Sequence, residues 1–329
     1  IYTTTDTLSL HDALPIFVLL VGPTNSGKST SMQSIARRIR DRRSKTMKLV
    51  TVEDPVEYII PGACQMGVPH GRRQLEGENG NIYNTLIKAT LREDPDAVIV
   101  GEIRDATAAD AVKNLVLAGR KIISTLHVFE SMAVFSRLRE LGIPESVLFM
   151  PGFISGVIYQ RLVPVLCPHC GVKFTDAFAR GLVDPAVFDR VSHVLDLHAT
   201  NVRVRSPGGC EKCAHMGIVG RTICSEILQP DASFLELMRK GEGQAARNLW
   251  LQNPELNISG WGVSAVAHGI SKIAVGEVDP ADVESQIGLI RTDQLHGISL
   301  APLSSSSVSM FVEQPGQAGT NSLIGLYNN

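Results

Sequence analysis

Short apolar runs alternate with helical patterns through the first half of the chain. Runs rich in β-branched residues predict strands at 17–21, 48–53, 97–101 and 121–125. Apolar positions spaced three and four residues apart predict helices at 28–43, 82–93, 106–118 and 130–141. Because the strands are apolar on both faces, the alternation predicts an α/β domain with a largely parallel sheet covered by helices.

The two ends of the chain lack these periods. Residues 1–16 contain TLSLHDALPI, which resembles translated sequencing-adapter sequence, so we expect a non-native segment there and a native N-terminal half that is missing. Residues 291–329 are rich in Ser, Gly, Gln and Asn, which predicts a loose tail.

Composition narrows the class of protein. The 329 residues are 44% hydrophobic and 19% charged, which excludes disorder over most of the chain. A net charge of -2 argues against a surface built throughout to hold nucleic acid. No apolar run is long enough for a membrane helix. Six cysteines are too few for a disulfide scaffold, so we expect a reducing, cytoplasmic setting.

A phosphate-binding loop follows the first predicted strand. The pattern G-x-x-x-x-G-K-[ST] is complete, between a buried strand and a helix. Glycines let successive backbone N–H groups converge on phosphate oxygens, while Lys28 would reach the β- and γ-phosphates and Ser29 would bind Mg²⁺. A chance glycine loop is the alternative, and this context disfavours it. The loop comprises Gly22, Pro23, Thr24, Asn25, Ser26, Gly27, Lys28, Ser29 and Thr30.

Polar side chains end the other predicted strands. Glu102 follows 97–101, and His127 comes shortly after 121–125. Glu53 ends 48–53 and Asp54 follows it, so either of these two places a carboxylate at the same edge. The C-terminal ends of strands in a doubly wound sheet face the ligand crevice. Each residue alone could be an ordinary solvated group. Together, beside the loop, they predict groups that hold Mg²⁺ and orient a water for ATP hydrolysis.

Four cysteines form two C-x-x-C pairs, Cys167 with Cys170 and Cys210 with Cys213. Four thiolates in a tetrahedral array are typical of a structural Zn²⁺ site. The long gap between the pairs predicts a small inserted subdomain. A thioredoxin-like redox pair is disfavoured, because two pairs occur and neither opens a βαβ helix.

Three segments after the loop resemble the secretion ATPase superfamily of type II secretion and type IV pilus systems. TVEDPVEY, LREDPDAVIVGEIRD and AGRKIISTLH are similar to its Asp box, Walker B segment and His box. The resemblance implies that Glu53 positions the water, Glu102 acts on Mg²⁺ and His127 senses the γ-phosphate. Arg104 would be a charge partner at the site. The sequence departs from the family at Arg120, where His is usual, and at Val128, where Thr is usual.

The same resemblance implies a domain organisation. A RecA-like P-loop core would cover 17–165, and a tetracysteine zinc subdomain would cover 166–228. A helical C-terminal region would follow at 229–290. The tetracysteine element resembles that of type II secretion and pilus-assembly ATPases. Because retraction ATPases of the family generally lack it, the resemblance favours an assembly function.

The resemblance further implies a homo-hexameric motor in the cytoplasm, peripheral at the inner membrane, that docks to an integral platform protein. Two other readings stay open. One is a RecA-like nucleic-acid motor of a conjugation system, although the basic residues near the end of helix 28–43 lack interleaved aromatic residues for stacking bases. The other is an inactive truncated fragment that only binds nucleotide.

Overall fold

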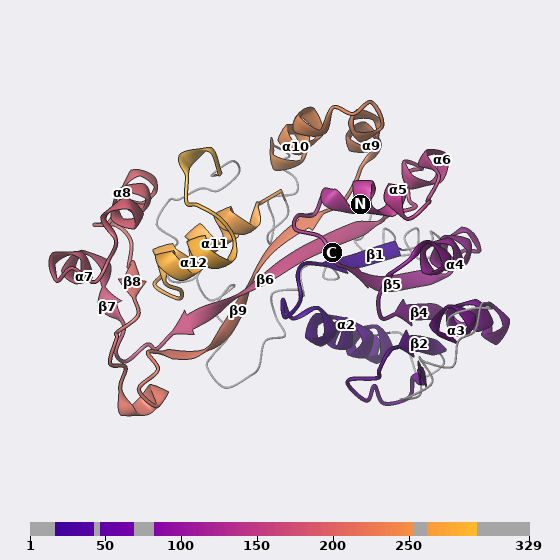
Figure 1. Ribbon diagram of the computed structural model, residues 1–329, viewed down its shortest axis with the longest axis horizontal. Helices are drawn as coiled ribbons and strands as arrows, with labels where there is room; N and C mark the ends of the chain where they lie inside the picture. Colours follow the sequence, from indigo (N-terminus) through magenta and orange to yellow (C-terminus); the bar gives the residue numbers. More distant parts are fainter. Residues whose placement is uncertain (1–16, 43–46, 69–81, 253–261, 295–329) are drawn as a thin grey trace, which may run out of the picture. The chain divides into compact units, whose positions relative to one another are not determined.

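The computed structural model describes residues 17–42, 47–68, 82–252 and 262–294 (Figure 1). The chain forms two compact units. The first contains the described residues up to Tyr159 and the segment Ile227–Trp250, and the second contains Gln160–Glu226 and the described residues from Leu251 on. Segment 1–16 and the tail beyond 294 lie outside the described residues, and the predicted domain boundaries stay a prediction.

A mostly parallel sheet is the centre of the first unit. Its strand order is β3-β2-β4-β5-β1-β6-β9, and every pairing with a defined register from β3 to β6 is parallel. The strands are β1 (Phe17–Val21), β2 (Leu49–Glu53), β3 (Cys64–Gly67), β4 (Ala97–Val100), β5 (Lys121–Leu126), β6 (Gly156–Leu166) and β9 (Ile218–Leu228). The long strands β6 and β9 each contribute residues to both units. The parallel α/β prediction is confirmed.

Helices follow the strands as the apolar spacing predicts. Asp105 accepts a hydrogen bond from the Ala108 N–H and so caps the N-terminus of the helix that begins at Ala106. Gly119, with a φ of 82°, follows the end of the same helix. Within the described ranges, no helix has the length and apolar character needed to cross a membrane. The helices of this unit are α2 (Lys28–Arg42), α3 (Ile82–Thr90), α4 (Ala106–Leu117), α5 (Ala133–Glu140), α6 (Glu145–Leu148), α9 (Ala232–Arg239) and most of α10 (Gly243–Gln252).

Two helix predictions were too long. The helix expected at 82–93 ends at Thr90, and a 3₁₀ turn, η2 (Leu91–Glu93), follows it. Asp94 then takes a left-handed φ of 45° ahead of Pro95, which prevents the helix from continuing. The helix expected at 130–141 is only α5.

The second unit packs small helices around a separate apolar cluster. Phe174, Val191, Cys224, Ile270 and Val283 are among its fully buried members. Its elements are β7 (Val172–Lys173), α7 (Phe174–Ala179), α8 (Pro185–Val194), β8 (Arg203–Val204), η3 (Glu211–Cys213), α11 (Ala265–Ala274), α12 (Pro280–Gln286) and η5 (Thr292–Gln294). Strands β7 and β8 pair antiparallel.

An ion pair fastens α8 to α12. Arg190 donates from Nε and Nη2 to the two carboxylate oxygens of Glu284, each at 2.6 Å. The Ile290 N–H also donates to Glu284, whose side chain is 8% exposed. This bidentate geometry compensates the cost of burying the carboxylate.

His268 is a buried titratable group within the second unit. The Ser225 N–H donates to its Nδ1 at 3.2 Å. Burial, reinforced by the charge of Lys272, lowers the pKa of His268 from 6.5 to about 3. The folded unit therefore keeps this imidazole neutral at pH values where an unfolded chain would protonate it.

This difference predicts acid sensitivity of the second unit. The unfolded chain takes up the His268 proton near pH 6.5 and the folded chain only near pH 3. The free energy of unfolding should therefore fall as the pH is lowered below 6.5, by up to about 1.4 kcal/mol per pH unit. In His268→Asn, the side-chain carbonyl oxygen can replace Nδ1 as acceptor, and the free energy of unfolding should depend less steeply on pH. Thermal unfolding of both proteins at pH values between about 3 and 6.5 measures this dependence. An equal dependence in the two proteins would contradict the low pKa of His268.

Candidate functional site

The loop between β1 and α2 has the backbone needed to surround a phosphate. Gly22, Asn25 and Gly27 have φ values of 144°, 62° and 87°. Glycine, and less often Asn, accepts this region without steric strain. Gly22, Ser26 and Lys28 are buried, Pro23, Gly27 and Ser29 are half-buried, and Thr24, Asn25 and Thr30 are exposed.

Lys28 lies folded into this loop. Its Nζ donates to the carbonyl oxygens of Gly22 at 2.9 Å and Pro23 at 2.7 Å. Burial lowers the pKa of Lys28, and the nearby Glu102 charge opposes that shift. The loop therefore holds a partly desolvated cation, a group well suited to bind a polyphosphate.

The structure brings Glu102, Arg104, Asp54 and His127 together at the C-terminal edge of the sheet. Arg104 donates from Nε to Glu102 Oε2 at 3.0 Å and from Nη1 to Asp54 Oδ2 at 2.8 Å. It thus bridges two carboxylates that follow the adjacent strands β2 and β4. Arg104 thus contacts both carboxylates, and its role as a charge partner of the site stays a prediction.

His127 approaches the other oxygen of Glu102. Its Nε2 lies 3.4 Å from Glu102 Oε1. Desolvation and the charge of Lys28 lower the pKa of His127, although Glu102 opposes them. The imidazole is accordingly neutral near pH 7, so it can donate one hydrogen bond and accept another.

Tyr83 of α3 supports Glu102 through the backbone, a role that the sequence analysis missed. Its hydroxyl accepts from the Glu102 N–H at 2.9 Å and donates to the Glu102 carbonyl oxygen at 3.0 Å. The guanidinium of Arg104 lies 5.7 Å from the ring centroid. A Cβ at Gly101 would stand 3.2 Å from the Val52 carbonyl oxygen, so a small residue is needed beside this contact.

Glu53 belongs to a second hydrogen-bonded group at the same edge. Thr51 and Gln65 both donate to its Oε1. Neither donor was predicted. Thr51 precedes Glu53 by two residues and so shares its face of β2, which is a signal that the sequence did contain. Gln65 lies on β3, a short strand that the apolar pattern does not reveal.

Arg120, the departure from the family pattern, lies elsewhere. It precedes β5, and its Nη1 donates to the Pro95 carbonyl oxygen at 3.0 Å, ahead of β4. These are the starts of the strands, the edge opposite the loop. Arg120 therefore fixes the turn before β4 and is not part of the site.

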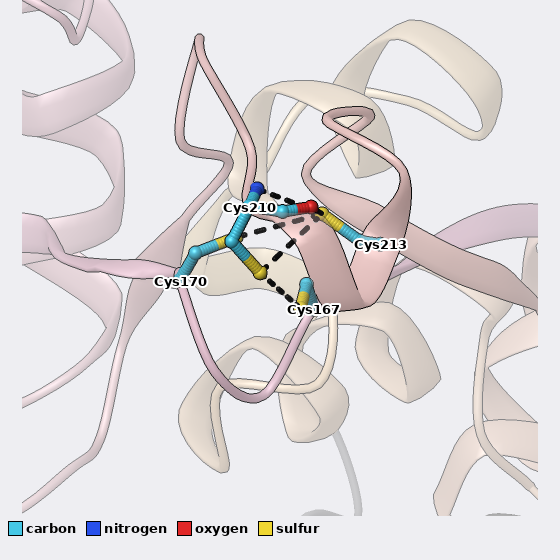
Figure 2. A group of neighbouring side chains, drawn as sticks. All are labelled: Cys167, Cys170, Cys210 and Cys213. Atoms are coloured by element: carbon cyan, nitrogen blue, oxygen red, sulfur yellow. Dashed lines mark hydrogen bonds between the residues drawn. The ribbon is translucent and has the colours of Figure 1, made fainter.

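The four predicted metal ligands converge in the second unit (Figure 2). The sulfur of Cys210 lies 3.8 Å from those of Cys167 and Cys213, and the Cys170 and Cys213 sulfurs are also 3.8 Å apart. All four Sγ atoms lie within 4.8 Å of one another. The first pair follows β6. In the second pair, Cys210 directly precedes η3 and Cys213 is its last residue. The two pairs thus come together across a long insertion.

Backbone N–H groups point at one of these sulfurs. Cys210 and Gly217 each donate to Cys213 Sγ at 3.2 Å. Desolvation opposes ionisation of this thiol, but the two N–H groups and neighbouring thiols lower the pKa of Cys213 to about 6. The environment therefore favours a thiolate, the form that binds metal, at Cys213, whereas burial and the neighbouring thiols raise the pKa of Cys170 to about 12.

A tight turn shapes the second pair. Ala214 and His215 both have positive φ values. Gly209 packs so closely that a Cβ there would lie 2.4 Å from the His215 backbone. Only glycine fits at 209 without a shift of the turn.

His169 and His215 are exposed. Among the described residues, the group of side chains that could hold a metal ion contains cysteines alone.

Comparison with known proteins places these features in context. A family model described as type II/IV secretion system protein matches residues 5–279. The type II secretion system protein E of Dickeya dadantii (strain 3937) is 32% identical over 254 residues, 77% of this chain and 46% of that protein. The type IV pilus assembly ATPase PilB of Thermus thermophilus is 34% identical over 213 residues, 65% of this chain and 22% of that protein. The chain thus spans about half or less of these curated relatives.

A solved structure is similar in fold. The Legionella pneumophila ATPase DotB aligns with a TM-score of 0.54 at 18% sequence identity, covering 85% of this chain and 62% of that one. At this identity the likeness concerns the fold alone.

The Tyr83 contact predicts a measurable loss of stability. Tyr83→Phe removes only the hydroxyl and leaves the partly buried Glu102 N–H and carbonyl oxygen without this partner. The free energy of unfolding should fall by about 1–3 kcal/mol, measured by urea denaturation. Tyr58→Phe is the matched control, because Tyr58 is 46% exposed, and it should change stability by less than about 0.5 kcal/mol. Equal effects of the two substitutions would refute this role.

Proposed function

The chain belongs to the type II/IV secretion system protein family, and we propose that it is the nucleotide-hydrolysing part of a motor ATPase for type II secretion or type IV pilus assembly. The observation that carries the proposal is the complete phosphate-binding loop with a desolvated Lys28 beside Glu102 and His127. We assign the first unit to a RecA-like P-loop core.

ATP would bind with its phosphates against the loop of residues 22–30. Lys28 would exchange its two carbonyl contacts for the β- and γ-phosphate oxygens, since the ammonium gains more from an anion than from neutral carbonyls. The N-terminus of α2 adds its partial positive charge. This part of the site supplies binding and orientation.

Mg²⁺, which residues Ser29 and Glu102 would hold, supplies charge neutralisation on the phosphates. Arg104 keeps the Glu102 carboxylate oriented, and Tyr83 fixes its backbone. The neutral imidazole of His127 would donate to the γ-phosphate. Glu53 orients the attacking water from the neighbouring strand end.

Zinc fits the tetracysteine group. Sulfurs about 2.3 Å from a tetrahedral zinc lie roughly 3.8 Å apart, a spacing that three sulfur pairs here match. Cys167, Cys170, Cys210 and Cys213 would hold the ion as a closed structural site. It would stabilise the second unit and take no part in hydrolysis.

The assembly and its partners follow from the family. We propose a homo-hexamer at the cytoplasmic face of the inner membrane, docked on an integral platform protein. The net charge of -2 agrees with protein partners better than with nucleic acid.

Two substitutions test the catalytic assignment. Lys28→Ala should abolish ATP binding, because it removes the cation of the loop. Glu102→Gln should retain binding but hydrolyse ATP about 10- to 100-fold more slowly, since a neutral amide would hold Mg²⁺ less well than the carboxylate does. Binding of a fluorescent ATP analogue and phosphate release measure the two effects, with the surface variant Glu140→Gln as control.

The same assay separates the rival functions. Normal hydrolysis by Glu102→Gln would show that Glu102 is wrongly assigned. Nucleotide binding without any hydrolysis would favour a binding-only fragment. Stimulation by single-stranded DNA would favour a nucleic-acid motor, and we expect none.

Metal analysis tests the zinc assignment. The purified protein should contain one zinc per chain, measured by inductively coupled plasma mass spectrometry. Cys213→Ser should lose the metal and lower the melting temperature of the second unit, because four-thiolate coordination is broken. Cys64→Ser, at an exposed cysteine outside the group, should retain it. A metal-free protein with an unchanged melting temperature would exclude a structural zinc.

A further inference from the structure

The carboxylate of Glu53 lies among polar side chains on one face of the sheet edge. Side chains alternate along a strand, so Thr51 and Glu53 point to the same side of β2. In the parallel pairing of β2 with β3, Thr51 is aligned with Gln65. The register therefore brings three polar side chains from two strands onto one face.

Two neutral donors converge on a single oxygen of this carboxylate. The Thr51 hydroxyl donates to Glu53 Oε1 at 2.6 Å, and the Gln65 amide donates to the same atom at 3.0 Å. Thr51 is fully buried, and Glu53 is 8% exposed. Within the described part of the chain, Oε2 accepts no hydrogen bond. The carboxylate is thus held on one side only.

The Gln65 amide can face Glu53 in only one orientation. The Ile60 N–H donates to Gln65 Oε1 at 2.8 Å, and Gln65 Nε2 also donates to the Tyr58 carbonyl oxygen at 2.9 Å. A backbone N–H only donates and a carbonyl only accepts, so exchange of the amide atoms would break both contacts. Residues 58–60, at the end of the Asp box and just after it, therefore set which atom of the Gln65 amide faces Glu53.

We propose that Thr51 and Gln65 are positioning residues that hold Glu53 through Oε1 and so present Oε2 to the water that attacks ATP. The inference rests on the proposed function, in which Glu53 orients that water. A carboxylate already fixed in one rotamer needs no reordering when the water binds, and turnover gains from this geometry while ATP affinity does not. The substitution effects should therefore appear in kcat and not in KM.

Thr51→Val and Thr51→Ser form a matched pair in the full-length protein. Valine keeps the shape of the side chain and removes the donor, whereas serine keeps the hydroxyl. Thr51→Val should lower kcat by about 10- to 100-fold with an unchanged KM for ATP, and Thr51→Ser should stay within about threefold of the unaltered protein. Gln65→Met removes the second donor. Because Gln65 lies on the edge strand β3, this variant still tests the inference if Thr51→Val does not fold.

A double-mutant cycle with Glu53→Gln decides whether the two residues act through Glu53. Combined with Glu53→Gln, Thr51→Val and Gln65→Met should cause no further loss of the residual turnover. Losses of the same size in both backgrounds, a rise in KM alone, or normal kcat in both variants would overturn the inference. If Glu53→Gln itself turns over normally, the proposed role of Glu53 fails instead.

Discussion

The in-register parallel pairing of four strands is the constraint on which the site depends. Val52 is level with Val100, Val100 with Ser124, and Val21 with Leu126. The residues that follow each of these positions therefore leave the sheet at the same edge. A slip of one residue would turn every side chain of a strand to the other face. The register of the buried apolar strands thus brings the loop, the acidic residues and the histidine to one edge.

The charged groups at this edge are each held by a partner that limits the cost of desolvation. Arg104 lies between the carboxylates of Glu102 and Asp54, and Lys28 rests on carbonyl oxygens. His127 avoids the cost by staying neutral. Each of these charged groups is thus compensated by a neighbour from this chain.

Much of this arrangement could be predicted from the sequence. Four strands and the helix after the loop were predicted within about a residue, because strong periodicity and turn residues such as Gly119 act locally. The convergence of Glu102 with His127 follows from the general rule on strand ends.

The supporting contacts could not be predicted in the same way. In the sequence, Tyr83 is one more apolar position of a predicted helix. Its hydroxyl bonds the Glu102 backbone only because the fold brings α3 next to the residues that follow β4. Gln65 sits on a strand of four residues whose pairing depends on the buried strand beside it. Contacts of this kind depend on tertiary placement, which no local pattern records.

The pairing of the two C-x-x-C segments has an evolutionary consequence. The residues between them form a loop that is closed where the sulfur atoms of Cys167 and Cys210 lie 3.8 Å apart. The entropy of closing a loop grows only with the logarithm of its length, and doubling it costs about 0.6 kcal/mol. Insertions and deletions at the exposed turn near Leu182, between α7 and α8, can therefore accumulate while the ends stay fixed. The turn near Leu182 is therefore a place where a change of length has a low entropic cost.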